Sequence, residues 1–228
     1  MSIDTLPILE REIQEESLAD LVGRLGGIPL ERIRLHPTPG TATEEDVVQT
    51  KCCELLDGVL VEKAMGWEES TWAALLIQIL GRYLAQNPIA IIAGADGLTR
   101  LAPGRVREPD VAVYLLSRFP SGRAKPRAIC DLAPDWAIEI LSRSNTSPEM
   151  EIKRHHYFEA GVRRVWIVDP RARIIKDWSS PMLMNVLSAT DVADLDQILP
   201  GFQLKIGDWF AMVDAVLEPE PDGHGGLQ

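Results

Sequence analysis

The sequence predicts an α/β fold, or α+β if hairpins dominate, in which a mixed β-sheet is flanked by helices. The main observation is a strand–helix–strand pattern over residues 136–168, because a helix that connects two apolar strands in this way usually crosses over a sheet. An amphipathic helix and short apolar strands precede it. With 228 residues, 46% hydrophobic and 25% charged, the chain has the composition of a globular domain that buries a large core.

In the first half of the chain, residues 54–62 are predicted to form a β-hairpin, since an Asp-Gly turn separates two short apolar arms. Apolar residues recur at i, i+3, i+4 and i+7 across residues 72–83, which predicts the clearest helix of the chain, and an Asn-Pro pair ends it. Short strands are expected at residues 89–93 and 97–101.

In the second half, apolar runs at residues 111–116 and 136–141 predict two strands. The following helix is expected to begin with Ser147 as its N-cap, with Pro at the first position, and to close at Gly161. The remaining expected elements are a buried strand at 165–168, a strand at 173–178 paired with it, and a closing element around 199–210 that packs on the sheet.

We expect three parts: a partly helical N-terminal extension over residues 1–50, a main domain over 51–212, and an acidic, flexible tail over 213–228. The first residues are acidic and show no secretory signal, and the apolar stretches fall short of the roughly 18 residues of a membrane helix. The three cysteines form no CxxC pair, so free thiols and a cytoplasmic location are expected.

The net charge of −11 disfavours a polyanionic partner, but the charge is unevenly distributed. Residues 100–176 hold 15 Lys and Arg against 9 Asp and Glu, whereas both flanking segments are strongly acidic. A solvated loop is the simpler interpretation of any single basic residue. Together they permit a phosphate-contacting face, for which Arg105 and Arg107 are candidates.

Two carboxylates, Asp110 and Glu139, stand in apolar strands. An ionised carboxylate there is costly unless it is paired or holds a metal. Strand alternation places Glu139 on one face with Ala137 and Leu141, and its other neighbours on the opposite face. If the two strands are neighbours, we expect the carboxylates to meet beyond the strand ends. Their hard oxygens suit Mg²⁺ or Mn²⁺.

Lys153 shares a helix face with Met150 and Tyr157, so it is a candidate to turn inward and stabilise charge at a metal-bound phosphate. Tyr157 is then a possible accessory residue. The alternative is an ordinary surface ion pair, since Glu149 stands four residues before the lysine. Spacing alone leaves both open.

Weaker candidates lie elsewhere. Glu62 and Glu69, near the start of the first long helix, are possible extra carboxylates, although solvated surface is the simpler interpretation. Ser142 and Ser144 belong to a polar strand-to-helix turn whose amides are possible phosphate contacts. No GxGxxG, P-loop, GxSxG or HExxH pattern is present, which removes the common nucleotide, hydrolase and zinc interpretations.

The order of these motifs resembles the Uma-two family, which groups with the restriction-endonuclease-like PD-(D/E)xK nucleases. The resemblance covers roughly residues 50–210. It rests on several motifs in order, which are Glu54-Leu55-Leu56-Asp57-Gly58, Arg107-Glu108-Pro109-Asp110, Ile138-Glu139-Ile140-Leu141-Ser142, Lys153 with Tyr157, Gly161-Val162, Trp166-Ile167-Val168-Asp169-Pro170 and Leu199-Pro200-Gly201-Phe202.

The resemblance implies a restriction-endonuclease-like core over residues 51–212, with Asp110 and Glu139 as metal ligands and the backbone carbonyl of Ile140 as a further one. In the wider superfamily a lysine usually stands two residues after the glutamate, where this chain has Leu141. Related proteins move that lysine to the next helix, and Lys153 fits this relocation.

The function implied is Mg²⁺- or Mn²⁺-dependent endonucleolytic hydrolysis of nucleic acid, with DNA as the expected partner and no membrane partner. A homodimer is a further possibility, with the region around Trp166 and Trp178 as a candidate interface. Two alternatives remain open. One is a nuclease-like fold that binds nucleic acid or protein without cutting. The other is a structural protein whose carboxylates pair with Arg105 or Arg107.

Overall fold

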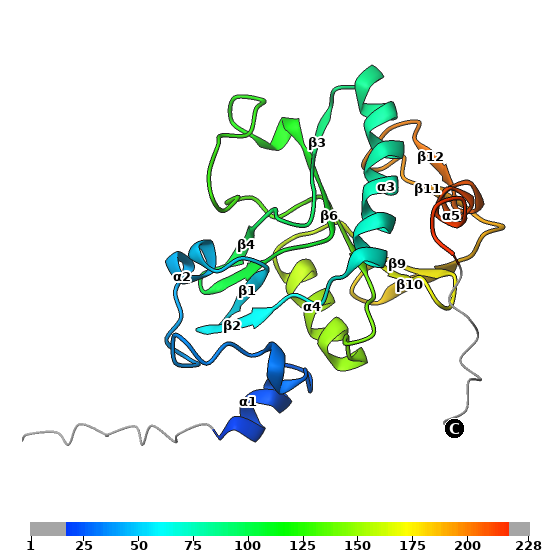
Figure 1. The fold of residues 1–228 in the computed structure, drawn as a ribbon. Helices are drawn as coiled ribbons and strands as arrows, with labels where there is room; N and C mark the ends of the chain where they lie inside the picture. The colour runs from blue at the N-terminus through cyan, green and yellow to red at the C-terminus, as the bar shows by residue number, and fades with distance from the viewer. Residues whose placement is uncertain (1–16, 219–228) are drawn as a thin grey trace, which may run out of the picture.

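A six-stranded mixed sheet forms the centre of the computed structural model, which describes residues 17–218 (Figure 1). Strands β7 and β8 are parallel, the crossover helix α4 (Ser147–Glu159) connects them, and the other neighbouring strands are antiparallel. The predicted strand–helix–strand unit is therefore confirmed. The strands in spatial order are β10 (Leu183–Leu187), β9 (Ile174–Ser180), β8 (Arg164–Asp169), β7 (Trp136–Ile140), β6 (Val111–Leu115) and β3 (Ala90–Ala93).

A four-stranded antiparallel sheet lies beside it, in the order β2 (Val59–Glu62), β1 (Cys53–Leu56), β5 (Arg105–Arg107) and β4 (Thr99–Ala102). The predicted hairpin is confirmed as β1–β2, and its turn places Asp57 at φ 48° and Gly58 at φ 83°. Because β5 and β6 belong to different sheets, the segment Glu108–Asp110 passes from one sheet to the other.

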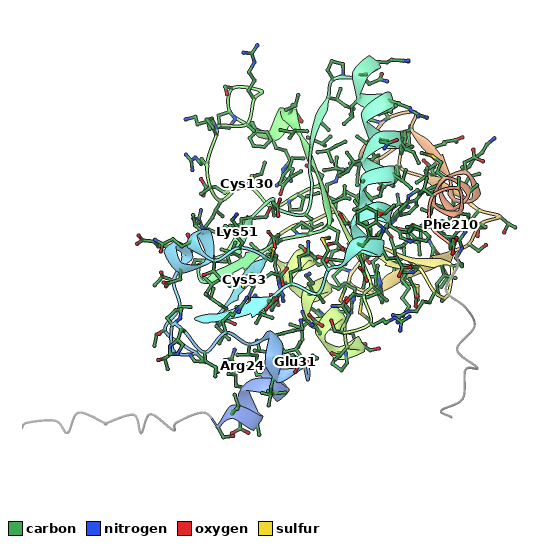
Figure 2. All side chains as sticks on the ribbon, viewed as in Figure 1. Arg24, Glu31, Lys51, Cys53, Cys130 and Phe210 are labelled. Atoms are coloured by element: carbon green, nitrogen blue, oxygen red, sulfur yellow. The ribbon has the colours of Figure 1, made fainter. Side chains whose placement is uncertain are left out.

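The helix α3 (Trp67–Gln86) covers one face of the six-stranded sheet, as the apolar periodicity predicted. Helix α5 (Ile206–Asp214) packs beside it, where Trp72 meets Trp209 with ring centroids 5.4 Å apart (Figure 1). Figure 2 labels Phe210 on this helix, and its ring lies 5.2 Å from that of Trp72. The short pair β11 (Val192–Asp194) and β12 (Gln203–Lys205) leads into α5 and completes the predicted closing element.

The opposite face of the sheet packs against α4. Ala137 belongs to the cluster on this face and Leu141 packs against it, whereas Ile138 and Ile140 point toward α3, so the predicted alternation of this strand is confirmed. The predicted N-cap of α4 is wrong by one residue, because the Thr146 hydroxyl caps the helix.

The N-terminal segment contains α1 (Leu18–Arg24), the 3-10 turn η1 (Leu30–Arg32) and α2 (Glu44–Gln49). Its apolar residues do not form a separate unit. They pack with Val59 and Val61 of β2, to which Ile33 adds an isolated bridge. The expected helical rhythm before residue 17 and the tail from residue 219 lie outside the described residues.

Several smaller expectations also have outcomes. Trp166 is fully buried, with its ring centroid 4.6 Å from that of Trp136, so this side chain itself offers no surface to a partner, and the dimer stays a prediction. Trp178 lies under the guanidinium of Arg154. Cys52, Cys53 and Cys130 are all free thiols, as expected. Within residues 17–218, no helix combines the length and apolarity needed to cross a membrane.

Candidate active site between the two sheets

Asp110 and Glu139 face one another on the α4 side of the six-stranded sheet. The β6–β7 register pairs Val111 with Ile138, so the next step of the antiparallel ladder sets Asp110 opposite Glu139. Both side chains are buried, at 2% and 4% exposure. The expected neighbouring strands are therefore observed, but the carboxylates meet across the ladder and not beyond the strand ends, since Glu139 lies inside β7.

Lys153 completes this pair from α4. Its Nζ lies 2.9 Å from Oε2 of Glu139, and the lysine is 5% exposed. Of the two alternatives for this residue, the inward orientation is the one observed. Glu149 instead forms a buried ion pair with Arg32, at 2.7 Å. The Tyr157 hydroxyl, one turn further along α4, donates a short hydrogen bond to Oε1 of Glu139.

Glu54 of β1 is a member of the cluster that the sequence did not single out. Its Oε1 lies 3.0 Å from Lys153 Nζ and accepts the backbone amide of Glu108, also at 3.0 Å, while Arg107 contacts its other oxygen at 2.7 Å. A signal was present, because Glu54 is an acid inside an apolar strand, the pattern that identified Glu139.

Lys63 is the second member that was missed. Its Nζ lies 2.7 Å from Oδ1 of Asp110, in a direction that makes an ion pair and not a hydrogen bond, and its side chain is 5% exposed. Oδ2 of Asp110 accepts the amide of Ile140 at 2.6 Å. This contact uses the N–H of Ile140, and its carbonyl as a metal ligand stays a prediction. Lys63 follows β2 in an irregular segment, so no periodicity marks it.

The buried charges of the cluster do not balance. Three cations, Lys63, Arg107 and Lys153, face four carboxylates, which are Glu54, Glu108, Asp110 and Glu139. Burial, with Asp110 as a like charge, raises the pKa of Glu139 to about 7 against the opposing effect of Lys153. Burial likewise raises the pKa of Glu108 to about 7. The cluster therefore carries up to one excess negative charge near neutral pH.

The cationic partners hold the other charges in place. Burial opposes ionisation of Glu54, but Lys153 and Arg107 outweigh it and keep the pKa of this carboxyl well below its usual range. Burial also opposes the charged form of Lys153, yet Glu139 and Glu54 raise its pKa overall. Burial and the neighbouring Arg107 lower the pKa of His156 to about 3, so this imidazole is neutral.

The donor set fits a divalent cation in its chemistry. Within the described residues, Oδ1 of Asp110 and Oε2 of Glu108 are buried oxygens without a hydrogen bond, and the excess negative charge favours a cation. No three His, Cys, Asp or Glu side chains of residues 17–218 stand ready as a metal site. Since Lys63 contacts Asp110, a cation that binds this oxygen must displace the ammonium.

Both arginines that were predicted to contact phosphate are engaged in ion pairs within the protein. Arg107 is 1% exposed and bound to Glu54 and His156, so its guanidinium does not face solvent and the predicted phosphate role is wrong. Arg105 is bound to Glu159 at 3.0 Å, which also commits its charge. Neither Arg105 nor Arg107 is bound to Asp110 or Glu139. The alternative in which these carboxylates pair with an arginine is therefore not observed.

The polar turn after β7 is hydrogen-bonded within itself, and its phosphate contacts stay a prediction. Ser142 donates its amide to Asn145 Oδ1 at 2.9 Å, and its hydroxyl lies 3.3 Å from that of Ser144. The two possible accessory acids are engaged elsewhere. Glu62 pairs with Arg34 at 3.0 Å, and Glu69 accepts the amide of Gly66 at 2.8 Å at the start of α3.

The mixed sheet, its crossover helix and the flanking helices define a protein of the restriction-endonuclease-like class. The crystal structure of a protein from Anabaena variabilis, titled a "putative nuclease", has the same fold, with a TM-score of 0.63 at 20% identity over 71% of this chain and 90% of that one. The chain belongs to the Uma2 family, described as "Putative restriction endonuclease", whose model matches residues 47–207. The resemblance noted in the sequence is thereby confirmed. No curated protein matches the chain.

Proposed function

We propose that this protein is a divalent-cation-dependent endonuclease that hydrolyses phosphodiester bonds in nucleic acid, with DNA as its substrate. The observation that carries the proposal is the convergence of Asp110, Glu139 and Lys153 in one buried cluster, with Lys153 Nζ 2.9 Å from Glu139. The family and the fold neighbour support the nuclease class.

In this proposal Asp110 and Glu139 hold Mg²⁺ or Mn²⁺, with the Glu108 carboxylate as a further oxygen donor. The ion, when bound, supplies Lewis-acid activation of water and neutralises phosphate charge. Lys153 favours the ionised form of Glu139 and stabilises the negative charge that develops at the phosphate. Tyr157 fixes the orientation of Glu139 through its hydrogen bond.

Glu54 is a positioning residue in this scheme. It holds Lys153 against Glu139 and is itself held by Arg107 and by the amide of Glu108. The same contact makes the β5–β6 connection part of the site, because Glu108 and Asp110 are separated by one proline. The hairpin β1–β2 thus supplies Glu54 and, just after its end, Lys63.

Cleavage of supercoiled plasmid with Mg²⁺ tests the proposal. We expect Asp110→Asn, Glu139→Gln and Lys153→Met each to lower the rate at least about a hundredfold. Glu151→Gln, on the exposed side of the same helix, is the matched control and should cleave like the wild type. Undiminished cleavage by all three cluster variants, after purification from host nucleases, would exclude this site.

Nucleic-acid binding without cleavage is a second candidate function, and one observation favours it. The ammonium of Lys63 already neutralises Asp110 and takes the place that a metal ion has in the first candidate. This candidate predicts that Mg²⁺ leaves the melting temperature unchanged while salt-sensitive DNA binding persists. The homodimer expected from the family resemblance stays a prediction, which sedimentation velocity measures directly.

A further inference from the structure

A cavity of about 570 Å³ lies between the edge strand β3 and the loop that follows β6. It is separate from the cluster of Asp110, Glu139 and Lys153, which we call the acid–lysine cluster. Its apolar lining includes Ile91 and Ala93 of β3, Tyr114 of β6 and Phe119 of the loop. The Tyr114 and Phe119 rings lie 6.5 Å apart at an interplanar angle of 52°. We call this cavity the edge pocket. Its volume falls in the range of pockets that hold one small organic ligand.

The loop over the edge pocket is fastened at both ends. Near its start, Arg118 donates to the carbonyl of Ala133 at 2.8 Å and pairs with Asp135 at 3.1 Å. Near its end, the Cys130 amide donates to the Leu98 carbonyl at 2.9 Å (Figure 2 labels Cys130). These contacts hold the loop against the sheet edge, so the pocket does not depend on the loop closing over a ligand.

The rim of the edge pocket carries uncommitted positive charge. Arg123 and Lys125 line it, both are exposed, and neither has an ion pair within the described part of the chain. The other basic residue of the loop tip, Arg127, is bound to Asp131. Two free cations above an aromatic, apolar interior match a ligand that is flat at one end and anionic at the other.

The edge pocket adjoins the acid–lysine cluster. Asp110 and Tyr114 lie on the same face of β6, four residues apart, which is roughly 13 Å along a strand. The β3–β4 connection contacts both the acid–lysine cluster and the edge pocket. Its Ala95 carbonyl accepts a hydrogen bond from Lys63 at 3.5 Å, and the next residue, Asp96, lines the pocket. The two places are therefore close enough for one extended nucleic-acid strand to span the distance between them.

We propose that the edge pocket binds an unpaired nucleobase of a substrate strand, with an adjoining phosphate held by Arg123 and Lys125. This inference rests on the proposed function in taking nucleic acid as the ligand. A base offers a flat face to the ring of Phe119, which packs on the buried Tyr114, and stacking of this kind does not depend on base identity. A fully paired duplex keeps its bases inside the stack, so the pocket favours single strands, mismatches or ends.

Binding of a fluorescein-labelled 12-nucleotide single strand, measured by anisotropy without Mg²⁺, tests the proposal separately from cleavage. We expect Phe119→Ala to weaken binding about tenfold and Phe119→Trp to restore it. The double substitution Arg123→Gln with Lys125→Gln should weaken binding and reduce its salt dependence. Arg82→Gln, an exposed basic residue on α3 at the other face of the sheet, is the matched control and should bind normally.

A second titration uses a strand of the same length whose sugars lack bases. Phe119→Ala should leave its affinity unchanged, because stacking is absent, whereas the double substitution should still weaken it. Wild-type binding that neither set of variants reduces would overturn the edge pocket, even if plasmid cleavage is intact. A selective loss in the pocket variants supports it, even if no cleavage is found. Absence of any single-strand binding by the wild type also overturns it.

Discussion

Lys63 and Asp110 form a buried ion pair, with Nζ 2.7 Å from Oδ1 and both side chains at or below 5% exposure. The lysine comes from the end of the β1–β2 hairpin and the aspartate from the start of β6, so the pair ties the four-stranded sheet to the six-stranded one. Under the proposed function, it occupies the aspartate oxygen that a divalent cation would bind. The proposal therefore predicts a response to cations that can be measured.

Lys63→Met should destabilise the cation-free protein by about 3–5 kcal/mol, because it leaves Asp110 buried without its counter-ion. Mg²⁺ should recover part of that loss and bind more tightly than to the wild type. Thermal unfolding with and without Mg²⁺ measures both effects. Lys51→Met is the control, because Lys51 is exposed (Figure 2). A variant that gains no more stability from Mg²⁺ than the wild type does would contradict the displacement of Lys63.

Cation binding should weaken as the pH falls below 7. The pKa of Glu139 is raised to about 7, so protons compete with the ion for this carboxylate below that pH. Calorimetric Mg²⁺ titrations between pH 6 and 8 should show a decline in affinity of up to tenfold for each pH unit. Glu108 has a similar pKa of about 7, so Glu108→Gln separates the two groups. Affinity independent of pH in the wild type would contradict the prediction.

Glu139 should also make stability depend on pH. Its folded pKa of about 7 exceeds the ordinary value of 4.5, so the folded state binds more protons than the unfolded state between these values. This contribution is fully present below pH 4.5 and is lost as the pH rises through 7. Urea denaturation of Glu139→Gln should therefore show a smaller loss of stability between pH 4.5 and 7 than the wild type shows. An identical slope for both proteins would rule this out.

His156 should act in the opposite direction. Its pKa of about 3 lies below the ordinary 6.5, so the unfolded state binds the extra proton between pH 3 and 6.5. The neutral imidazole accordingly favours the folded state above pH 6.5, and this contribution declines as the pH falls, by up to about 1.4 kcal/mol for each unit. Denaturation of His156→Gln near pH 5 should show less acid sensitivity than the wild type. The exposed His155→Gln is the control.

The N-terminal segment should influence activity through α4. Arg32 pairs with Glu149 at the start of the helix that carries Lys153, and a Cβ on Gly26 would lie 2.5 Å from the Glu149 backbone nitrogen. We expect Arg32→Met to cost about 3 kcal/mol and to slow plasmid cleavage. Gly26→Ala should do the same, since Gly26 also has φ +87°.

The exposed Glu31→Gln, labelled in Figure 2, is the control for this segment. Denaturant midpoints and cleavage rates should move together in Arg32→Met and Gly26→Ala. Wild-type cleavage by both destabilised variants would show that the segment supports the fold without positioning α4.

Local patterns in the sequence predicted most of the elements. The alternation in β7 placed Glu139 on the opposite face from Ile138 and Ile140, and helical spacing placed Lys153 with Tyr157. These features depend on the strand period of two and the helix period of 3.6, which any short stretch of sequence displays. The Asp-Gly turn of the β1–β2 hairpin was equally local.

What the sequence by itself determined, then, is the position of most elements and the buried faces of α3, β7 and α4, whereas the short strands β5, β10 and β11 were not predicted. Only the tertiary structure decided that β3 and β4 join different sheets, that Arg107 forms its ion pair with Glu54, and that Lys63 forms one with Asp110. Each of these depends on residues more than forty positions apart or on the choice of a strand partner. These pairings depend on how the whole chain packs. Burial removes water from a charged side chain, so its partner is whichever opposite charge the fold places beside it.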